Sequence, residues 1–457
     1  MKELTLKQIA DWCGGTVAPE YETVPVTGVE SDSRKVEVGD LFVALRGERV
    51  DGHDFIPSAK TLGASAALVS RPSEELPCVV VESPLRAYGE IAKHYREMTG
   101  VKVVGITGSV GKTTTKEMIA SVLSRDFKLY KSEGNHNNEI GLPMTVMNMP
   151  EDTELLVAEL GTNHPGEIAY LSAIAQPDYA VITNIGIAHI EYLGSREGIL
   201  REKLDILRSS LKTTVGIFNG DEPLLWNVRD KGTHKKYYFG IDNPSCDVVA
   251  SGIQELDDGM RFHVSGFHHE FELFVPALGR HMVYNALAAA TVGLAMGVKP
   301  ETIQNELSIF RNTGMRQKIY EKNGMTIIED CYNAGPESTE AALGVLASVK
   351  TSGKRIAVLG DMLELGNRSS AEHYRIGRIA AQKADLLLTY GAHSVRTVTG
   401  AITGGMSPKN AEHFDTHEDL VRMLKMRAGE ADVILFKGSR GMRMEKALSL
   451  FLKEEES

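Results

Sequence analysis

Residues 105–123 read GITGSVGKTTTKEMIASVL, and this stretch decides the fold. The apolar, β-branched residues Val103 and Ile106 predict a buried strand at its start. Met118 and Val122 recur at helical spacing, which predicts a helix at its end. The glycines between the two let backbone N–H groups turn toward one point, where the helix N-terminus adds a positive dipole. The stretch therefore predicts a phosphate-binding loop between a strand and a helix.

The loop departs from the strict pattern G-x-x-x-x-G-K-[ST], because Ile106 stands where the first glycine belongs. Lys112 is expected to reach the outer phosphates of a nucleotide, and the Thr113 hydroxyl to bind a magnesium ion. A strand-to-helix turn with a chance lysine is the alternative interpretation. The predicted ATP-binding residues of the loop are Gly108, Ser109, Val110, Gly111, Lys112, Thr113 and Thr114.

Composition indicates a globular protein of the cytoplasm. A chain of 457 residues is too long for one ordinary core, so two or three domains are expected. No apolar run reaches the length of a membrane span, and the N-terminus lacks a signal-peptide core. The four cysteines show neither zinc spacing nor a disulfide framework. The net charge of −11 argues against nucleic acid as a partner.

The order of apolar segments predicts an α/β fold with three domains. An α/β N-terminal domain is expected over residues 1–97, where LFVAL and CVVV indicate short strands. A central P-loop ATPase domain with a parallel sheet is expected over 98–313, because its strands repeatedly end at polar or small residues. A Rossmann-like C-terminal domain is expected over 314–457, where strands such as RIAVLGDM alternate with helical segments.

Polar side chains follow the central strands. Glu159 ends an apolar strand, beside the phosphate loop if the sheet is parallel, and its carboxylate can hold magnesium. An ordinary strand-end glutamate is the alternative. His189 follows the next apolar strand, and a lone histidine is more often structural than metal-binding. Lys203 lies within a helical segment, and its spacing alone indicates a solvated lysine.

Several motifs occur together and in order: GITGSVGKTTT, SEGNHNNEIGLP, AELGTNHPGEI, TNIGIAHIEYLGS, EDCYNAGPEST and KGSRGMRMEKAL. In this combination the chain resembles the Mur ligases, the ATP-dependent amino-acid ligases of bacterial cell-wall precursor synthesis. The resemblance covers nearly the whole chain. The joint occurrence of DGHDF, GNHNNEIGLP, YNAGPES and LGDMLELG is most similar to the members that join D-alanyl-D-alanine to UDP-N-acetylmuramoyl-tripeptide. The member that adds the third residue is expected to carry a DNPR-like motif, which is absent.

The resemblance implies roles for individual residues. Lys203 corresponds to the lysine that the family carboxylates, and His189 to a ligand of the same second magnesium ion. Glu159 is expected between two magnesium ions, and Thr113 at the first. The implied catalytic residues are Lys112, Glu159, His189 and Lys203, and the implied metal ligands are Thr113, Glu159, His189 and Lys203.

Other implied residues bind the substrates. His281 and Asn285 are expected near the adenine, and Arg316 and Asp330 are expected to close over the γ-phosphate and the ribose. Ser33, Arg34 and the segment GERVDGH are expected to hold the UDP-sugar. The remaining implied substrate-binding residues are Asn137, Asn138, Tyr332 and Asn333. Gly335 stands where the family commonly has a second asparagine.

The activity implied is the formation of an amide bond through an acyl phosphate, with ATP and two magnesium ions, by a chain expected to be a monomer. Two other readings stay open. One is a related ligase, such as a folylpolyglutamate synthetase or the third-residue enzyme. The other is a P-loop nucleotide switch that regulates a partner, which would need no amine acceptor.

Overall fold

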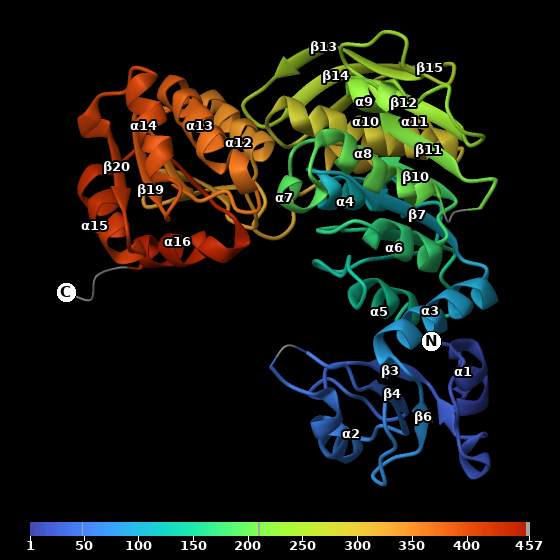
Figure 1. Cartoon of the computed structure of the whole chain (residues 1–457). Coiled ribbons are helices and arrows are strands. Elements are labelled where there is room, and N and C mark those ends of the chain that lie inside the picture. The colour runs from blue at the N-terminus through green and yellow to red at the C-terminus, as the bar shows by residue number, and fades with distance from the viewer. Residues whose placement is uncertain (48, 209–210, 454–457) are drawn as a thin grey trace.

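The computed structural model describes residues 1–47, 49–208 and 211–453. Glu48, in the segment GERVDGH, lies outside the described residues. Within these ranges the strands form four sheets, three of which organise the N-terminal, central and C-terminal parts of the chain (Figure 1). No described helix combines the length and the apolar character that crossing a membrane requires.

The N-terminal part is built on a four-stranded parallel sheet of order β3-β4-β5-β6. A short antiparallel pair, β1-β2, lies beside it. The strands are β1 (Leu4–Thr5), β2 (Pro25–Val26), β3 (Gly28–Glu30), β4 (Asp40–Val43), β5 (Ala66–Val69) and β6 (Cys78–Val80). The helices are α1 (Leu6–Cys13), α2 (Ile56–Leu62) and α3 (Pro84–Thr99).

The central part is built on a nine-stranded sheet of order β15-β14-β13-β12-β11-β10-β7-β9-β8. Its strands are β7 (Lys102–Thr107), β8 (Leu129–Lys131), β9 (Leu155–Glu159), β10 (Tyr179–Ile182), β11 (Val215–Asn219), β12 (Lys235–Gly240), β13 (Val248–Glu255), β14 (Met260–Gly266) and β15 (His269–Val275). The helices are α4 (Lys112–Leu123), α5 (Gly141–Met147), α6 (Glu167–Ala175), α7 (Ile190–Leu193), α8 (Arg196–Leu204), α9 (Pro223–Trp226), α10 (Arg280–Ala295) and α11 (Pro300–Ser308).

The predicted strand, loop and helix of residues 105–123 are confirmed as β7, the turn after it and α4. The sheet is parallel from β8 to β13, as expected next to the loop, but β14 and β15 pair in antiparallel fashion. The sequence motifs do not predict this extension, because β14 and β15 carry no candidate functional residue at their ends. Their alternation of buried and exposed residues is instead typical of a sheet with one solvated face.

The C-terminal part is built on a six-stranded sheet of order β16-β17-β21-β18-β19-β20, in which only the edge strand β16 is antiparallel. The strands are β16 (Lys318–Lys322), β17 (Met325–Asp330), β18 (Arg355–Gly360), β19 (Leu386–Tyr390), β20 (Ala411–Phe414) and β21 (Val433–Lys437). The helices are α12 (Pro336–Ser348), α13 (Ser369–Lys383), α14 (Val395–Thr403), α15 (His417–Arg427) and α16 (Met444–Leu452). The α/β class is confirmed, and the domain boundaries at 97 and 313 stay a prediction.

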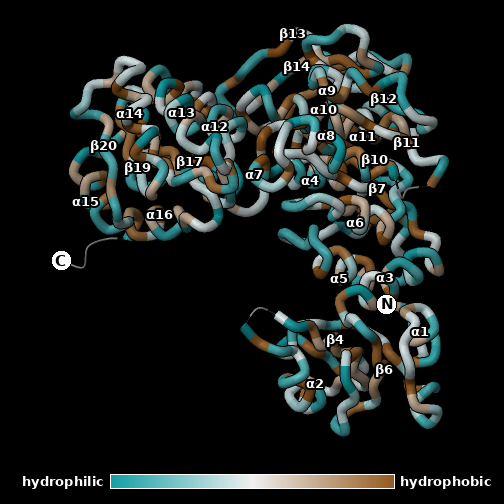
Figure 2. Tube along the Cα trace, viewed as in Figure 1, coloured by the Kyte–Doolittle hydropathy of each residue, from teal (hydrophilic) through white to brown (hydrophobic). Residues whose placement is uncertain are grey.

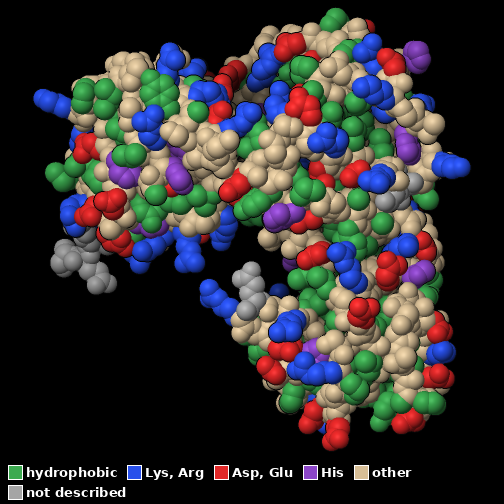
Figure 3. All heavy atoms as spheres, in the orientation of Figure 1, with side chains coloured by type: hydrophobic (Ala, Val, Ile, Leu, Met, Phe, Trp, Pro, Cys, Tyr) green, Lys and Arg blue, Asp and Glu red, His purple; other side chains and the backbone are tan. Residues whose placement is uncertain are grey.

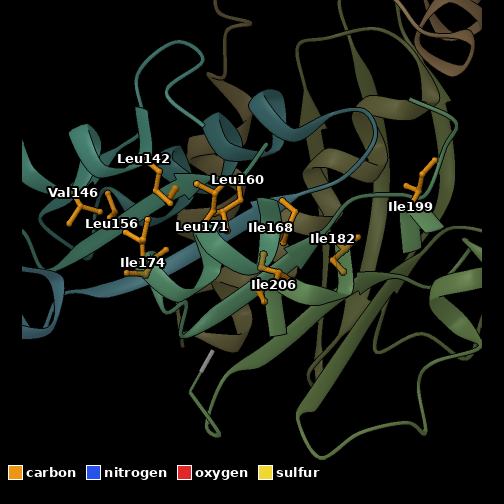
Figure 4. Close-up of a cluster of buried hydrophobic side chains, with 14 of the residues drawn as sticks. Leu142, Val146, Leu156, Leu160, Ile168, Leu171, Ile174, Ile182, Ile199 and Ile206 are labelled. Atoms are coloured by element: carbon orange, nitrogen blue, oxygen red, sulfur yellow. The ribbon is translucent and has the colours of Figure 1, made fainter. Parts of the chain in front are cut away.

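Alternation along the central strands produces two cores, one on each face of the sheet. Leu156 and Ala158 of β9 join the core formed with α5, α6 and α8, whereas Leu155 and Val157 join the core formed with α4 and α10. Figure 4 shows the first core, with apolar side chains of helices and strands pointing toward one another. In Figure 2, many residues along the strands of the central part are hydrophobic. Apolar packing on both faces of the sheet fixes the positions of β7, β9 and β10 where these strands end.

Helix α3 joins the N-terminal part to the central sheet. It packs against α5 and α6 (Figure 1). Arg96, only 8% exposed, donates from Nη2 to the Gln176 carbonyl at 2.9 Å and to Asp178 Oδ2 at 3.2 Å. Asp178 Oδ2 also accepts the Val103 N–H of β7 at 2.8 Å. One carboxylate therefore fixes the helix and the first central strand to each other.

We expect Asp178→Ala to destabilise the protein by about 3 kcal/mol, because Arg96 and the Val103 N–H would lose a partner in a largely buried place. The measurement is the midpoint of the first calorimetric unfolding transition. Asp230→Ala is the matched control, since Asp230 is 81% exposed and pairs only with Arg229 at the surface. Equal midpoints for the two variants would contradict this account.

Candidate functional site

The turn after β7 requires its two glycines. Gly108 has φ +152° and Gly111 has φ +83°. A Cβ atom at Gly108 would lie 1.9 Å from Thr183 Oγ1, and one at Gly111 would lie 2.8 Å from Asn285 Oδ1. Both positions therefore exclude a larger residue, by backbone conformation and by space.

The turn is held in shape by residues that follow β10. The Thr183 hydroxyl donates to the Val110 carbonyl at 2.6 Å, and Asn184 Oδ1 accepts the Val110 N–H at 3.0 Å. Ser109 Oγ accepts the Gly186 N–H at 2.9 Å. These contacts hold the loop in one conformation before a ligand binds. Binding therefore costs little conformational entropy in the loop backbone.

Lys112, the first residue of α4, folds back over the turn, and its Nζ donates to the Gly108 carbonyl at 2.9 Å. Burial lowers the pKa of Lys112, the charge of Glu159 raises it, and the charge of Arg316 lowers it. Arg316 belongs to the C-terminal part, so two cations from distant parts of the chain meet at the N-terminus of one helix. This arrangement suits a multiply charged anion.

Glu159 is the last residue of β9 and is 3% exposed. Its Oε2 accepts a hydrogen bond from Thr113 Oγ1 at 2.7 Å, and its Oε1 accepts one from Asn137 Nδ2 at 2.9 Å. Among the described residues, no group of three His, Cys, Asp or Glu forms a metal cluster. Magnesium, however, is commonly held by one or two carboxylates together with phosphate oxygens, so Thr113 and Glu159 fit that ion.

His189 and Lys203 occupy different surroundings from Glu159. His189 has φ +59°, and its Nδ1 lies 2.5 Å from Glu364 Oε2 of the C-terminal part. Lys203, on α8 as predicted, is 2% exposed. Within residues 1–47, 49–208 and 211–453, no hydrogen-bond or ion-pair partner of its Nζ is found. Burial, followed by the charge of Lys112, sets the pKa of Lys203 well below its usual range.

The C-terminal part contributes a second polar group. The Arg316 guanidinium stacks 3.9 Å from the centroid of the Tyr332 ring. Asp330, at the end of β17, accepts from Lys437 Nζ at 2.6 Å, and the same Nζ donates to the Asn333 carbonyl at 2.9 Å. Gln317 connects this group to the central part, because its side chain contacts His281 Nε2 at 2.8 Å and donates to the Leu278 carbonyl at 2.7 Å.

Most of the predicted residues line one cavity of about 1370 Å³ between the central and C-terminal parts. The predicted residues that line it are Ser109, Val110, Gly111, Lys112, Thr113, Thr114, Asn137, Asn138, Glu159, His189, His281, Asn285, Arg316, Asp330, Tyr332 and Asn333. Gly108 and Lys203 are not among the residues that line this cavity. Asn138 also caps α5, its Oδ1 accepting the Gly141 N–H at 2.9 Å.

Ser33 and Arg34 line a separate cavity of about 820 Å³ in the N-terminal part, together with Phe42, Leu45 and Phe55. Arg34 pairs with Asp32 at 2.7 Å within that part. Figure 3 shows the molecule hollowed between its N-terminal and C-terminal parts, with Lys and Arg side chains on both flanks. The predicted residues thus line two separate cavities.

Sequence reasoning missed three side chains at the main cavity or bound to residues that line it. Lys437 ends an apolar strand and is register-paired with Asp330, so the strand-end rule that identified Glu159 could have found it. Glu202 accepts from Thr162 Oγ1 and from the N–H groups of Gly166 and Ile168, at 3.1, 2.6 and 2.8 Å. No local signal marks Glu202 or Gln317, because their partners lie far away in the chain.

Comparisons with known proteins agree along the whole chain. The catalytic domain of the Mur ligase family matches residues 25–108, the Mur ligase middle domain matches 106–293, and the Mur ligase glutamate ligase domain matches 315–440. UDP-N-acetylmuramoyl-tripeptide–D-alanyl-D-alanine ligase of Bacillus subtilis is 42% identical over 98% of both chains. The enzyme of that name from Escherichia coli is 35% identical over 98% of both chains.

Solved structures show the same architecture. MurF from Acinetobacter baumannii superposes with a TM-score of 0.91 at 32% identity, covering 99% of this chain and 100% of the other. MurF ligase from Thermotoga maritima, solved in complex with ADP, has a TM-score of 0.83 at 30% identity and covers 94% of this chain and 98% of the other. With its phosphate loop, its buried strand-end carboxylate and full-length likeness to these enzymes, this chain belongs to the Mur ligase family.

Proposed function

We propose that this chain is an ATP-dependent ligase that joins D-alanyl-D-alanine to UDP-N-acetylmuramoyl-tripeptide, a step of peptidoglycan precursor synthesis. The observation that carries the ligase chemistry is the preformed phosphate loop beside the Thr113–Glu159 pair, in a cavity that the C-terminal part completes. The substrates are those in the names of the full-length relatives. ATP as the nucleotide is supported by the relative that was solved with ADP.

The reaction needs an activated carboxylate, because a free carboxylate does not acylate an amine at neutral pH. Transfer of the γ-phosphoryl group to the tripeptide carboxylate gives an acyl phosphate and ADP. The amine of D-alanyl-D-alanine then attacks the acyl carbon, a proton is lost, and inorganic phosphate leaves from the tetrahedral intermediate. Both steps gather negative charge, which positive groups held in place beforehand can stabilise.

The chain supplies those groups at the loop. Lys112 would face the outer phosphates, and Arg316 lines the same cavity from the C-terminal part. Asp330, held by Lys437, also lines it and would face the nucleotide from that part. Two magnesium ions, held by Thr113 and Glu159 and by His189 and a carboxylated Lys203, would neutralise charge on the phosphate oxygens. Because Arg316 and Asp330 come from another part of the chain, closure of that part completes the site and excludes water from the acyl phosphate.

The surroundings of Lys203 support the proposed carboxylation. Lys203 is buried, its Nζ has no acceptor among the described residues, and Lys112 adds a like charge nearby. These conditions favour the neutral amine, which is the form that adds to carbon dioxide. Addition gives a carbamate and releases one proton. The ammonium that the site disfavours is thereby replaced by an anion suited to magnesium.

We also propose that the enzyme acts in the cytoplasm as a monomer. The N-terminal part, residues 1–97, would hold the UDP-sugar at the cavity of Ser33 and Arg34. The central part, 98–313, would hold ATP, and the C-terminal part, 314–457, would close over it. Asn137, Asn138, Tyr332 and Asn333, which line the main cavity, would face the peptide substrates.

Lys112→Ala is expected to lower the rate of ligation about 100- to 1000-fold, because a cation facing the transferred phosphoryl group is removed. Binding of the UDP-sugar substrate, measured by calorimetry, should persist. Lys102→Ala is the matched control, since Lys102 is exposed at the start of β7, the strand that precedes the loop. Ligation by Lys112→Ala at the control's rate would show that the loop assignment is wrong.

Arg316→Gln is expected to lower kcat at least about 100-fold, because the C-terminal part would close without its cation. The KM for the UDP-sugar substrate should change little. Phosphate release under saturating substrates measures the effect. Arg311→Gln provides the comparison, since Arg311 lies outside the cavity lining. If both variants kept wild-type kcat, the C-terminal part would have no role in charge stabilisation through Arg316.

Lys203→Ala is expected to lose most activity and to recover part of it in added acetate, whose two oxygens can occupy the place of the carbamate. Lys203→Arg should stay inactive, because a long cation still fills that place. Ligation rates are compared across acetate concentrations at fixed ionic strength, so that screening is not mistaken for rescue. Full activity of Lys203→Ala without acetate would leave this lysine without a role in the reaction.

A further inference from the structure

The main cavity extends from the phosphate loop to a cation on α3. Arg86 and Tyr170 both line it, and the Arg86 guanidinium lies 4.3 Å from the centroid of the Tyr170 ring. A Cβ atom at Gly89, one turn further along α3, would lie 2.1 Å from the Tyr170 hydroxyl oxygen. Glycine at this position therefore lets the ring of α6 approach α3 and support the guanidinium from one side.

Other cations of the cavity are occupied. Lys112 donates to loop carbonyls, and Lys437 is bound to Asp330. Arg440 pairs with Glu445 at 2.9 Å. Within the described part of the chain, no carboxylate lies at ion-pair distance from the Arg86 guanidinium. Arg316 likewise stacks on a tyrosine, but its charge acts on Lys112 and is assigned to the nucleotide. Among the described residues, Arg86 is thus a cation that packs on the Tyr170 ring and has no carboxylate at ion-pair distance.

The position of Arg86 matches the path of a long substrate. Helices α3, α5 and α6 lie between the sheet of the N-terminal part and β7 with α4 (Figure 1). Arg86 stands near the start of α3, and the phosphate loop lies farther along the same cavity. If the UDP group of the substrate lies in the N-terminal part and the reacting carboxylate lies at Lys112, the peptide of that substrate lies between these two points.

We propose that Arg86 binds a non-reacting carboxylate of the peptide and thereby selects an acidic stem peptide. This inference rests on the proposed function. The name of one related structure describes its substrate as an alanyl-D-glutamyl-2,6-diaminopimelate peptide. Such a peptide carries a free glutamyl carboxylate and a second diaminopimelate carboxylate besides the reacting one. A guanidinium stacked on a ring keeps its N–H edge free for a carboxylate, which it binds through two parallel hydrogen bonds.

The test compares three UDP-linked peptides at saturating ATP and D-alanyl-D-alanine. One is the full acidic peptide, one has the glutamyl carboxylate as an amide, and one has lysine in place of diaminopimelate. For the wild type, the KM should rise about 10- to 100-fold with the analogue that lacks the bound carboxylate. In Arg86→Gln the KM for the acidic peptide should rise by a similar factor, and that analogue should no longer be discriminated.

Lys93→Gln is the matched control, because Lys93 lies on the same helix outside the cavity and pairs only with Glu90. Its three KM values should stay at the wild-type level. The KM for ATP should be unchanged in Arg86→Gln, which separates peptide recognition from general damage. If Arg86→Gln does not fold, Arg86→Lys decides, since it keeps the charge and should keep the discrimination while the KM rises.

Two results would overturn the assignment. One is a wild-type KM for the acidic peptide in folded Arg86→Gln. The other is unchanged discrimination of both analogues in that variant, which would place the carboxylates elsewhere. Failure of the wild type to ligate any of the three peptides would instead reject the proposed function, so the two failures are distinguishable.

Discussion

The site depends on how the carboxyl group of Glu159 is held in the interior. It is 3% exposed, and both of its oxygens accept hydrogen bonds, one from Thr113 and one from Asn137. Removing a carboxylate from water without such partners costs several kcal/mol. The end of β9, the start of α4 and the turn before α5 must therefore keep their mutual positions. That requirement also fixes the phosphate loop, which begins one strand away on β7.

The C-terminal part meets this arrangement through polar contacts that lie beside an apolar cluster containing residues of both parts. Glu337 accepts the Ile187 N–H at 2.9 Å, Gln317 contacts His281, and Glu364 pairs with His189. Hydrogen bonds of this kind contribute about 1 kcal/mol each, because both partners can bind water when the parts separate. Polar contacts of this kind would allow the C-terminal part to close over substrates and open again, as the proposed function requires.

Local patterns predicted the strands that end in the site. A few adjacent residues are enough to show an apolar run that ends at a polar residue. Glu159 and the loop were found in this way. The contacts between the central and C-terminal parts were not found, since the pairs His189–Glu364 and His281–Gln317 join residues far apart in the chain. Lys203 shows the limit most clearly. Its helix buries Gly198, Glu202 and Lys203 together, so no amphipathic pattern distinguishes a buried lysine from a solvated one. Only the resemblance to the family singled it out.

Positive charge converges on one point of the fold. The N-terminus of α4 faces the same region as Lys112 and Arg316. The charge of Lys112 also acts on Lys203. Groups of like charge repel one another unless an anion lies between them. A triphosphate therefore relieves a repulsion that the folded chain already contains. Because the contacts of the loop with Thr183 and Asn184 keep it in shape, this relief needs little rearrangement and can be used to stabilise charge during phosphoryl transfer. Burial first, and then the charge of Lys112, lowers the pKa of Lys203 and favours its uncharged amine. The proposed conversion of that amine to an anion would remove the repulsion between these two lysines.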